Sequence, residues 1–273
     1  MKDMRMKFAV LITCFNRVEK TLECLKHLYA CRLPEGVAFD VWLNDDGCTD
    51  GTGERVAKVF PTVNIIKGSG HDYWCGGMRR VWNAAAAHFD YEGYLWLNDD
   101  TMLNENALEI VLAQRGREKI LVGAVCGKDG KATYGGEDTK GFVIPDGTWH
   151  RLRQMNGNVV WVPRSVFRRL GNFPVFLTHS LGDCDYSRRA VEGGIDVLLS
   201  PSFIGVCEAN TRIPVWKNPD APLVNRFKSL YSPIGGSEPG VLFRYCLMHD
   251  GLFIAIKLLI GNHLRVLLPG VRR

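Results

Sequence analysis

The feature that most restricts the fold is a regular alternation of two kinds of segment over the first 126 residues. Short apolar runs rich in Val, Ile, Phe and Trp alternate with longer segments in which apolar residues recur every three or four positions. The runs predict buried strands and the longer segments predict amphipathic helices. Repeated strand–helix units form right-handed crossovers on a parallel sheet. We therefore predict an α/β layer of the nucleotide-binding type over residues 1–125, with strands at 7–14, 39–47, 63–68, 93–101 and 120–125. The predicted helices lie at 18–31, 78–89 and 105–115, and a further helix runs through Val56, Val59 and Phe60 with Thr49 or Asp50 as its cap.

The pattern changes after residue 126. Turn-like stretches rich in Gly, Asp and Pro predict antiparallel hairpins, and shorter strands and helices follow. From Pro214 onward prolines become frequent, and then a long apolar segment begins. We predict a second half at 126–213 and a C-terminal helical extension at 214–273. Within the second half we expect strands at 158–163, 196–201 and 203–207 and helices at 164–171 and 182–194.

The composition is that of an ordinary globular protein, with 46% apolar and 23% charged residues. The net charge of +5 fits a protein that handles anions or rests on an acidic membrane surface, without requiring either. No basic stripe with interleaved aromatic residues is present, so we expect no nucleic-acid partner. Nine scattered cysteines without C-x-x-C spacing indicate a reducing compartment. The apolar run at 8–14 lacks a cleavage site and is interpreted as a strand, so we expect a cytoplasmic protein.

Five residues, WLNDD, occur twice, at 42–46 and at 96–100. The flanking residues do not match, so the chain does not contain a longer repeat. Each copy ends a predicted strand, and ligands of open parallel sheets bind beyond the carboxyl ends of the strands. Clustered Asp oxygens there suit a hard divalent cation carrying a diphosphate. Either copy alone is compatible with turn and helix-cap chemistry, but the two together predict a ligand site.

Four segments, in this order, resemble an inverting family 2 glycosyltransferase with the GT-A fold: VLITCFNR, LNDDGCTDGT, GYLWLNDDTML and GDCDYSRRA. A fifth segment, HDYWCGGMRRVWNAA, is similar to the donor-side loop of bacterial surface-polysaccharide glycosyltransferases, including rhamnosyltransferase-like members. The resemblance covers roughly residues 6–210. It implies a Rossmann-like, mostly parallel sheet with a nucleotide-sugar half at 1–125, antiparallel acceptor-side elements at 126–213 and a helical tail.

The resemblance assigns the donor pocket to residues after the first two strands. Thr13, Phe15 and Arg17 would line the nucleotide with backbone and ring contacts. Asp45, with Asp46 beside it, would read the base by accepting a hydrogen bond from a base N–H.

The donor-side loop supplies a further set of candidates. Glycines let backbone approach a diphosphate closely, as Gly76 and Gly77 would, and the indole of Trp74 offers a flat face to a sugar. The alternative is a tight helix start with Trp74 in the core.

The second WLNDD copy stands at the family's D-x-D metal motif. Asp100 matches its last residue and would ligate Mg²⁺ or Mn²⁺, with Asp99 as a secondary candidate. Asn98 replaces the first Asp, which removes one negative charge and should weaken metal affinity. The third ligand stays open among Cys207, Glu208 and His179.

Asp183 matches the catalytic base of the family's E-D-x-D motif. It would take the proton from an acceptor hydroxyl that attacks the anomeric carbon. Asp185 and His179 are acceptor-side candidates, although Asp185 has Arg188 and Arg189 at helical spacing for an ion pair. Asp183 could instead cap a helix. The family's usual Glu is Gly182 here, which leaves the acceptor side less defined.

The apolar tail contains charge-free stretches at 251–256 and 258–264, shorter than the roughly 18 residues of a spanning helix. Arg244, Lys257 and Arg265 make it cationic. We expect a helix that lies on the inner membrane face or, as the alternative, packs on the core or on a second subunit.

Together these features predict a metal-dependent, inverting transfer of a sugar from a UDP- or dTDP-sugar to a hydroxyl of a glycan or lipid-linked acceptor in bacterial polysaccharide biosynthesis. A non-catalytic nucleotide- or glycan-binding module derived from a transferase is the alternative, which Asn98, Gly182 and the open third ligand favour. A sugar nucleotidyltransferase would need a glycine-rich loop after the first strand, and TCFNRVEK has no glycine.

Overall fold

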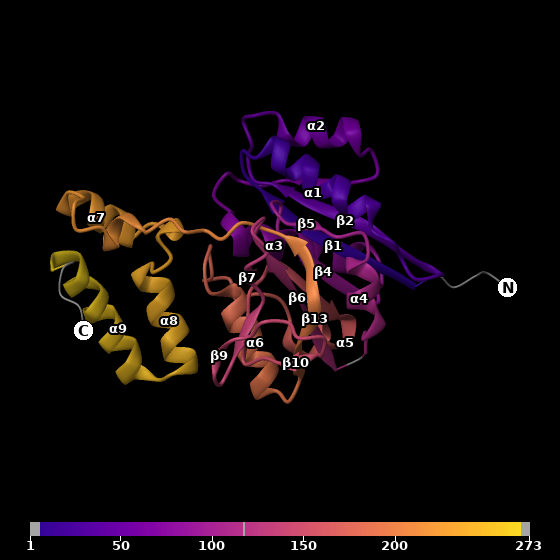
Figure 1. Cartoon of the computed structure of the whole chain (residues 1–273). Helices are drawn as coiled ribbons and strands as arrows, with labels where there is room; N and C mark the ends of the chain where they lie inside the picture. The colour runs from indigo at the N-terminus through magenta and orange to yellow at the C-terminus, as the bar shows by residue number, and fades with distance from the viewer. Residues whose placement is uncertain (1–5, 117, 269–273) are drawn as a thin grey trace.

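The computed structural model describes residues 6–116 and 118–268. Its centre is a mixed sheet in the order β10-β13-β6-β12-β4-β1-β2-β3 (Figure 1). Strand β1 pairs in parallel with β2 on one side and with β4 on the other, and β2 pairs in parallel with β3. The four strands are β1 (Met6–Cys14), β2 (Val37–Asp45), β3 (Asn64–Lys67) and β4 (Gly93–Leu97).

Helices cover both faces of the sheet, which gives three layers. Successive residues of β1 enter different cores, because side chains alternate along a strand. Phe8, Val10 and Ile12 belong to one apolar cluster, whereas Ala9 and Leu11 belong to the other. The first cluster receives α1 (Val18–Ala30), α2 (Thr52–Val59) and α4 (Ala107–Ala113); the second receives α3 (Tyr73–His88), α5 (Arg164–Leu170) and α6 (Gly182–Glu192).

Strand β12 (Val159–Pro163) inserts antiparallel between β4 and β6 (Lys119–Cys126), so the sheet is mixed. The two strands predicted at 196–201 and 203–207 form one strand, β13 (Asp196–Val206), with shifts in register after Leu199. The reason is local. The Ser200 hydroxyl accepts a hydrogen bond from the Ala124 amide at 2.9 Å, which carries the strand across the irregularity.

Small elements complete the second half. Strand β5 (Met102–Leu103) pairs with β13, β7 (Ala132–Tyr134) pairs with β6, and β10 (His150–Arg151) lies at the edge of the large sheet. A separate three-stranded sheet consists of β11 (Gln154–Met155), β8 (Gly136–Asp138) and β9 (Gly141–Phe142). These antiparallel pieces lie where hairpins were predicted.

The helix predicted to begin at residue 78 begins at Tyr73, so Trp74, Gly76 and Gly77 are part of α3 and not of a loop. The helix starts early because the Asp46 carboxylate binds the backbone amides at its amino end. That partner lies far away in the sequence.

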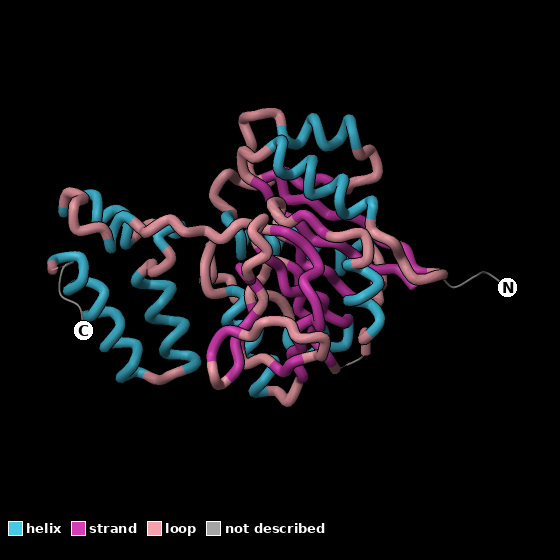
Figure 2. The backbone as a smooth tube through the Cα atoms, viewed as in Figure 1, coloured by secondary structure: helices cyan, strands magenta, loops and turns pink. Residues whose placement is uncertain are grey.

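After residue 213 the described chain is helical: η1 (Val215–Lys217), α7 (Leu223–Leu230), η2 (Pro233–Gly235), α8 (Pro239–His249) and α9 (Leu252–Leu267). These helices form a lobe beside the sheet, with α9 on the side of α8 away from it (Figures 1 and 2). Arg188 of α6 binds Asp250 at 2.8 Å, which ties the lobe to the body. Within residues 6–116 and 118–268, no helix has the length and apolar character needed to cross a membrane.

Candidate active site

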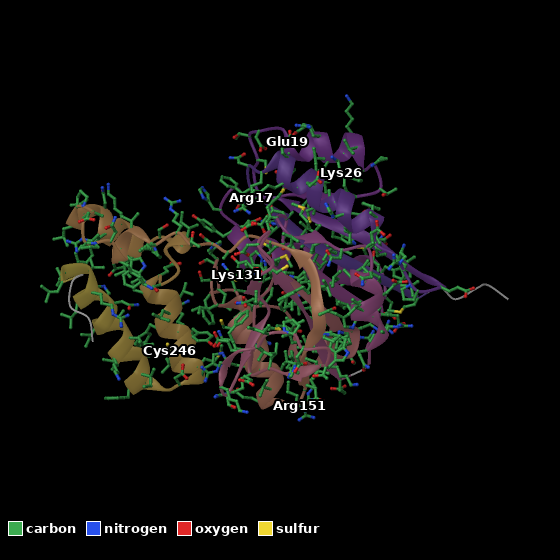
Figure 3. The ribbon with its side chains drawn as sticks, in the orientation of Figure 1. Arg17, Glu19, Lys26, Lys131, Arg151 and Cys246 are labelled. Atoms are coloured by element: carbon green, nitrogen blue, oxygen red, sulfur yellow. The ribbon has the colours of Figure 1, made fainter. Side chains whose placement is uncertain are left out.

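The two NDD segments lie at the same edge of the sheet, on either side of the end of β1. Since β1, β2 and β4 are parallel, their carboxyl ends meet there, as predicted. The segment after β1 carries Arg17 into this edge (Figure 3). We call residues 44–46 the first wall and residues 98–100 the second wall.

Asp45 of the first wall is neutralised inside the protein. Its side chain is fully buried, and its Oδ2 lies 2.5 Å from Lys67 Nζ at the end of β3. Its Oδ1 accepts a hydrogen bond from the Cys48 amide at 2.9 Å. Burial alone would raise the pKa of Asp45, but the Lys67 ammonium and the Cys48 hydrogen bonds outweigh it and hold the pKa below its ordinary value. Asp45 is therefore ionised at neutral pH.

The carboxylate of Asp46 binds backbone amides of the same protein. Its carboxylate accepts hydrogen bonds from the amides of Gly70 at 2.8 Å, Asp72 at 3.1 Å and Tyr73 at 2.9 Å. The partial positive charge of a helix amino end favours a carboxylate in this position. Asp46 thus fixes the loop before α3, so its predicted contact with the base would have to share oxygens already in use.

The second wall has a surplus of negative charge. Asp99 Oδ1 lies 3.2 Å and Asp100 Oδ2 lies 2.8 Å from the same nitrogen, Nη1 of Arg17. Burial raises the pKa of Asp99 to about 6, even though the Arg17 charge acts to lower it. Two carboxylates facing one guanidinium attract a further cation. This donor set fits a divalent metal of the kind that the sequence predicts.

Of the three residues left open as a third ligand, Cys207 is the one that contacts Asp100. Its thiol donates to Asp100 Oδ1 at 3.6 Å, and burial raises its pKa to about 11. Glu208 instead accepts a hydrogen bond from the Lys128 amide at 2.9 Å. The Nδ1 atom of His179 is buried without a hydrogen-bond partner among the described residues. Burial and the charge of Arg17 lower the pKa of His179, which keeps the ring neutral.

A second group of potential ligand atoms lies at the first wall. Atoms of Cys14, Asp45 and Cys48 lie within 4.8 Å of one another. Lys67 already neutralises this carboxylate. Burial also raises the pKa of both thiols, and only a thiolate binds metal well. We therefore place no metal there.

The first turns of α3 connect the two walls. The Trp74 indole N–H donates to Asn98 Oδ1 at 2.7 Å, so the amide that replaces the first acid of the metal motif binds Trp74. Gly77 lets α3 approach the sheet, because a Cβ there would lie 2.2 Å from Thr13 Oγ1 and 2.7 Å from Asn44 Nδ2. Trp74 is half-buried.

Other donor candidates have different surroundings. Phe15 is 53% exposed beside the end of β1, free to stack on a planar ligand. Gly76 lines a cavity of about 260 Å³ with His71, Asp72, Arg79, Arg80 and Thr178. Arg80 is held there by Asp72 at 2.7 Å.

Asp183 stands at the start of α6, next to Trp74. Its Oδ2 accepts a hydrogen bond from the Gly157 amide at 3.0 Å, and burial raises its pKa. Gly182 before it packs closely on α3, since a Cβ there would lie 2.6 Å from Cys75 Sγ and 3.2 Å from the Trp74 ring. A larger residue in place of Gly182, such as the family's Glu, would therefore have to displace these side chains.

Asp185 has both oxygens occupied within the protein. It is fully buried, its Oδ2 binds Arg189 at 2.7 Å, and its Oδ1 lies 3.0 Å from His249 Nε2 of α8. The sequence allows an ion pair of Asp185 with Arg188 or Arg189 along the helix. The pair is formed with Arg189, whereas Arg188 binds Asp250.

Sequence reasoning missed two features of this edge. Lys67, which neutralises Asp45, could have been found as the charged last residue of the strand beside β2. The other feature is backbone strain. The described non-glycine residues with positive φ are Asn16, Tyr73 and Leu181. Asn16 directly precedes Arg17, Tyr73 directly precedes Trp74, and Leu181 lies two residues before Asp183. Such conformations persist where surrounding structure fixes them, often at functional sites.

The comparisons with known proteins agree with this architecture. The model named "Glycosyl transferase family 2" matches residues 9–175. The mannosyltransferase PcManGT from Pyrobaculum calidifontis, solved with GDP-Man and Mn²⁺, is similar with a TM-score of 0.55 and 14% identity, over 97% of this chain and 76% of that one. TarS 1-349 from S. aureus, solved with UDP-GlcNAc, is similar with a TM-score of 0.57 and 16% identity, over 96% of this chain and 90% of that one.

No curated protein matches the chain in sequence. The likeness to the solved structures establishes the GT-A fold. The family model covers more than half of the chain, and the chain therefore belongs to glycosyl transferase family 2, whose members are nucleotide-sugar-dependent glycosyltransferases.

Proposed function

We propose that the protein is a metal-dependent, inverting glycosyltransferase that moves a sugar from a UDP- or dTDP-sugar to a hydroxyl. The observation that carries this proposal is the second wall, where Asp99 and Asp100 both bind the same nitrogen of Arg17. Asp183 is linked to the same wall, because its neighbour Gly157 packs on Trp74 and Trp74 binds Asn98. The proposed metal-binding carboxylates and the proposed general base are thus connected through Trp74 and Gly157.

In this proposal Asp100, with Asp99, holds Mg²⁺ or Mn²⁺. The bound ion would neutralise the charge that develops on the departing diphosphate. The predicted hydrogen bond from a base N–H to Asp45 would require Lys67 to move off its Oδ2, because this carboxylate is fully buried, whereas the exposed ring of Phe15 is free to stack on the nucleotide. Thr13 lies beside them, half-buried at the end of β1.

Asp183 is the proposed general base. Its carboxylate takes the proton of the acceptor hydroxyl while that oxygen bonds to the anomeric carbon, and the bond from this carbon to the diphosphate breaks on the opposite face. The raised pKa of Asp183 brings the carboxylate closer to the pKa that a base needs at neutral pH. One displacement inverts the configuration. The acceptor would approach over residues 126–213, which carry this side of the site.

We further propose a glycan or lipid-linked acceptor in bacterial polysaccharide assembly, with a hexosyl or rhamnosyl donor. The motif at 71–85 supports a surface-polysaccharide transferase. The nine cysteines are free thiols, which supports action in the reducing cytoplasm.

The test is a donor screen with UDP-, dTDP- and GDP-sugars, each with Mn²⁺ and with EDTA, and with glycan acceptors. We expect metal-dependent release of one nucleotide. Asp183→Asn should lower turnover by about 100-fold or more without weakening donor binding. Asp90→Asn is a matched control, because Asp90 is exposed and lies before β4, at the other end of that strand. Donor binding without any turnover across the acceptors would favour the non-catalytic module instead.

A further inference from the structure

Helix α9 (Leu252–Leu267) has a buried side and, opposite it, an exposed apolar side. Its inner side carries Ala255, Asn262 and Val266, which are buried against the other helices of the C-terminal lobe. These positions fall on one side of a helix, because side chains repeat about every 3.6 residues. The inner side therefore accounts for the packing of α9.

The second side, which we call the outer face, is exposed. Its five residues follow one another at intervals of three and four positions, so they form one stripe. They are Phe253 at 78% exposure, Ile256 at 42%, Ile260 at 53%, Leu264 at 46% and Leu267 at 49%. Side chains project outward from the side of α9 away from α8 (Figure 3). A contiguous stripe of large apolar side chains marks an interaction surface.

The charges around the outer face have one sign. Lys257 and Arg265 of α9 are exposed with no ion pair among the described residues, and the same holds for Arg244 of the neighbouring helix α8. Helix α9 contains no acidic residue. Asp250, which lies between the two helices, is bound by Arg188. The lobe therefore presents an apolar stripe flanked by unneutralised cations.

We propose that the outer face docks on a membrane surface that contains anionic lipid. Helix α9 would lie in the plane of the surface, with its stripe among the acyl chains and Lys257 and Arg265 at the headgroups. The unpaired cations favour this occupant over a second copy of the chain, because a copy of α9 brings more positive charge and no acid. A lipid-linked acceptor at this surface rests on the proposed function; the docking does not.

The lobe also connects the outer face to the site. Asp185 and Arg188 of α6 bind His249 and Asp250 at the end of α8. Docking through α9 would therefore orient α6, which begins beside Asp183, relative to the membrane.

The test is sedimentation of the full chain with vesicles of phosphatidylcholine alone and with 30% phosphatidylglycerol, about the content of an anionic membrane. We expect binding to the anionic vesicles that weakens at least about tenfold in Phe253→Ser/Ile260→Ser and falls as salt is raised. Lys257→Glu/Arg265→Glu should remove the preference for anionic lipid. Ile144→Ser/Val175→Ser is the matched control, because both residues are highly exposed and lie outside the lobe.

Urea unfolding of each variant separates loss of docking from loss of folding. Absence of wild-type binding, or equal binding by Phe253→Ser/Ile260→Ser, would overturn the proposal. If the wild type formed a dimer without lipid and Phe253→Ser/Ile260→Ser did not, the proposal would also be overturned, and the outer face would be assigned to a second copy. Donor turnover in solution is measured separately, so an inactive protein that still binds vesicles would refute the proposed function alone.

Discussion

The two walls of the site have the same sequence, Asn-Asp-Asp, but opposite electrostatics. In the first wall, Asp45 is paired with Lys67, and its pKa lies below the ordinary value. In the second wall, Asp99 and Asp100 share one guanidinium, and burial raises the pKa of Asp99 to about 6. The first wall is neutralised by the protein, whereas the second retains negative charge.

The difference comes from the neighbouring elements and not from the WLNDD residues. Strand β3 runs beside β2 and ends with Lys67, and the loop after it supplies the amides that Asp46 binds. Strand β4 has antiparallel β12 on its other side, an apolar strand that offers no cation. The protein thus neutralises a carboxylate pair at a strand end, or leaves it with negative charge, according to what the adjacent strand supplies.

The largest expected effect is on activity, from the second wall. Asp100→Asn should lower sugar transfer about 1000-fold, which corresponds to about 4 kcal/mol in the barrier, because it removes charge at the proposed metal site. Stability should change little, since Asp100 is partly exposed. Transfer assays and urea unfolding measure the two effects, with Asp90→Asn as the control. Full activity in Asp100→Asn would remove the second wall from the site.

The next effect is on stability, from the first wall. Asp46→Ala should cost about 3–4 kcal/mol of unfolding free energy, because it leaves the amides of Gly70, Asp72 and Tyr73 without their acceptor. Urea unfolding measures the loss. Asp46→Asn keeps one acceptor oxygen and should lose less. A cost below about 1 kcal/mol would mean that water replaces the carboxylate and that Asp46 is available to a ligand.

The position of both walls could be predicted from the sequence, because the strand–helix alternation alone places residues 45 and 99 at strand ends of one sheet. Their difference could not. It depends on Lys67, on amides at 70–73 and on Arg17, which meet the walls only through tertiary packing. The antiparallel insertion of β12 could not be predicted either, because a short apolar run does not indicate whether the strand pairs in parallel or antiparallel.

The same limit applies to the acceptor side. The sequence has Gly182 where the family has Glu, which in the sequence alone looks like the loss of an acceptor-side carboxylate. In the structure, the side chains of Cys75 and Trp74 occupy the space that a Cβ at this position would need. Asp185, by contrast, matches the family's motif, but its contact with His249 of the C-terminal lobe could not be predicted from the sequence.

The opposite pKa shifts of the walls predict a pH-dependent difference. The pKa of Asp99 rises from an unfolded value of about 3.9 to about 6 on folding, so its ionisation destabilises the protein as pH rises through this window. Asp99→Asn should therefore match the wild type at pH 4 and exceed its unfolding free energy by up to about 3 kcal/mol at pH 8. Urea unfolding at both pH values, without divalent metal, measures this.

The first wall supplies the contrasting control. The pKa of Asp45 is lowered on folding, so its pairing stabilises the protein above the unfolded pKa and is lost as pH falls through the folded one. Lys67→Met should therefore be destabilising at pH 7 and lose its effect in acid. If both variants showed the same pH dependence, the electrostatic contrast between the walls would be wrong.

The smallest expected effect comes from the amides that begin the two walls. Asn98→Asp adds a carboxylate beside Asp100, and its oxygens can still accept the Trp74 indole N–H. Because affinity for a hard cation rises with the charge of the ligands, Mn²⁺ binding should tighten roughly threefold to tenfold, or about 1 kcal/mol. Electron paramagnetic resonance of free Mn²⁺ measures this change in affinity.

Asn44→Asp makes the same change in the first wall, where the residue is fully buried against Thr13 and lies beside the Lys67–Asp45 pair. It should leave Mn²⁺ binding unchanged and lower stability, so equal tightening by the two variants would show that the metal bridges both walls.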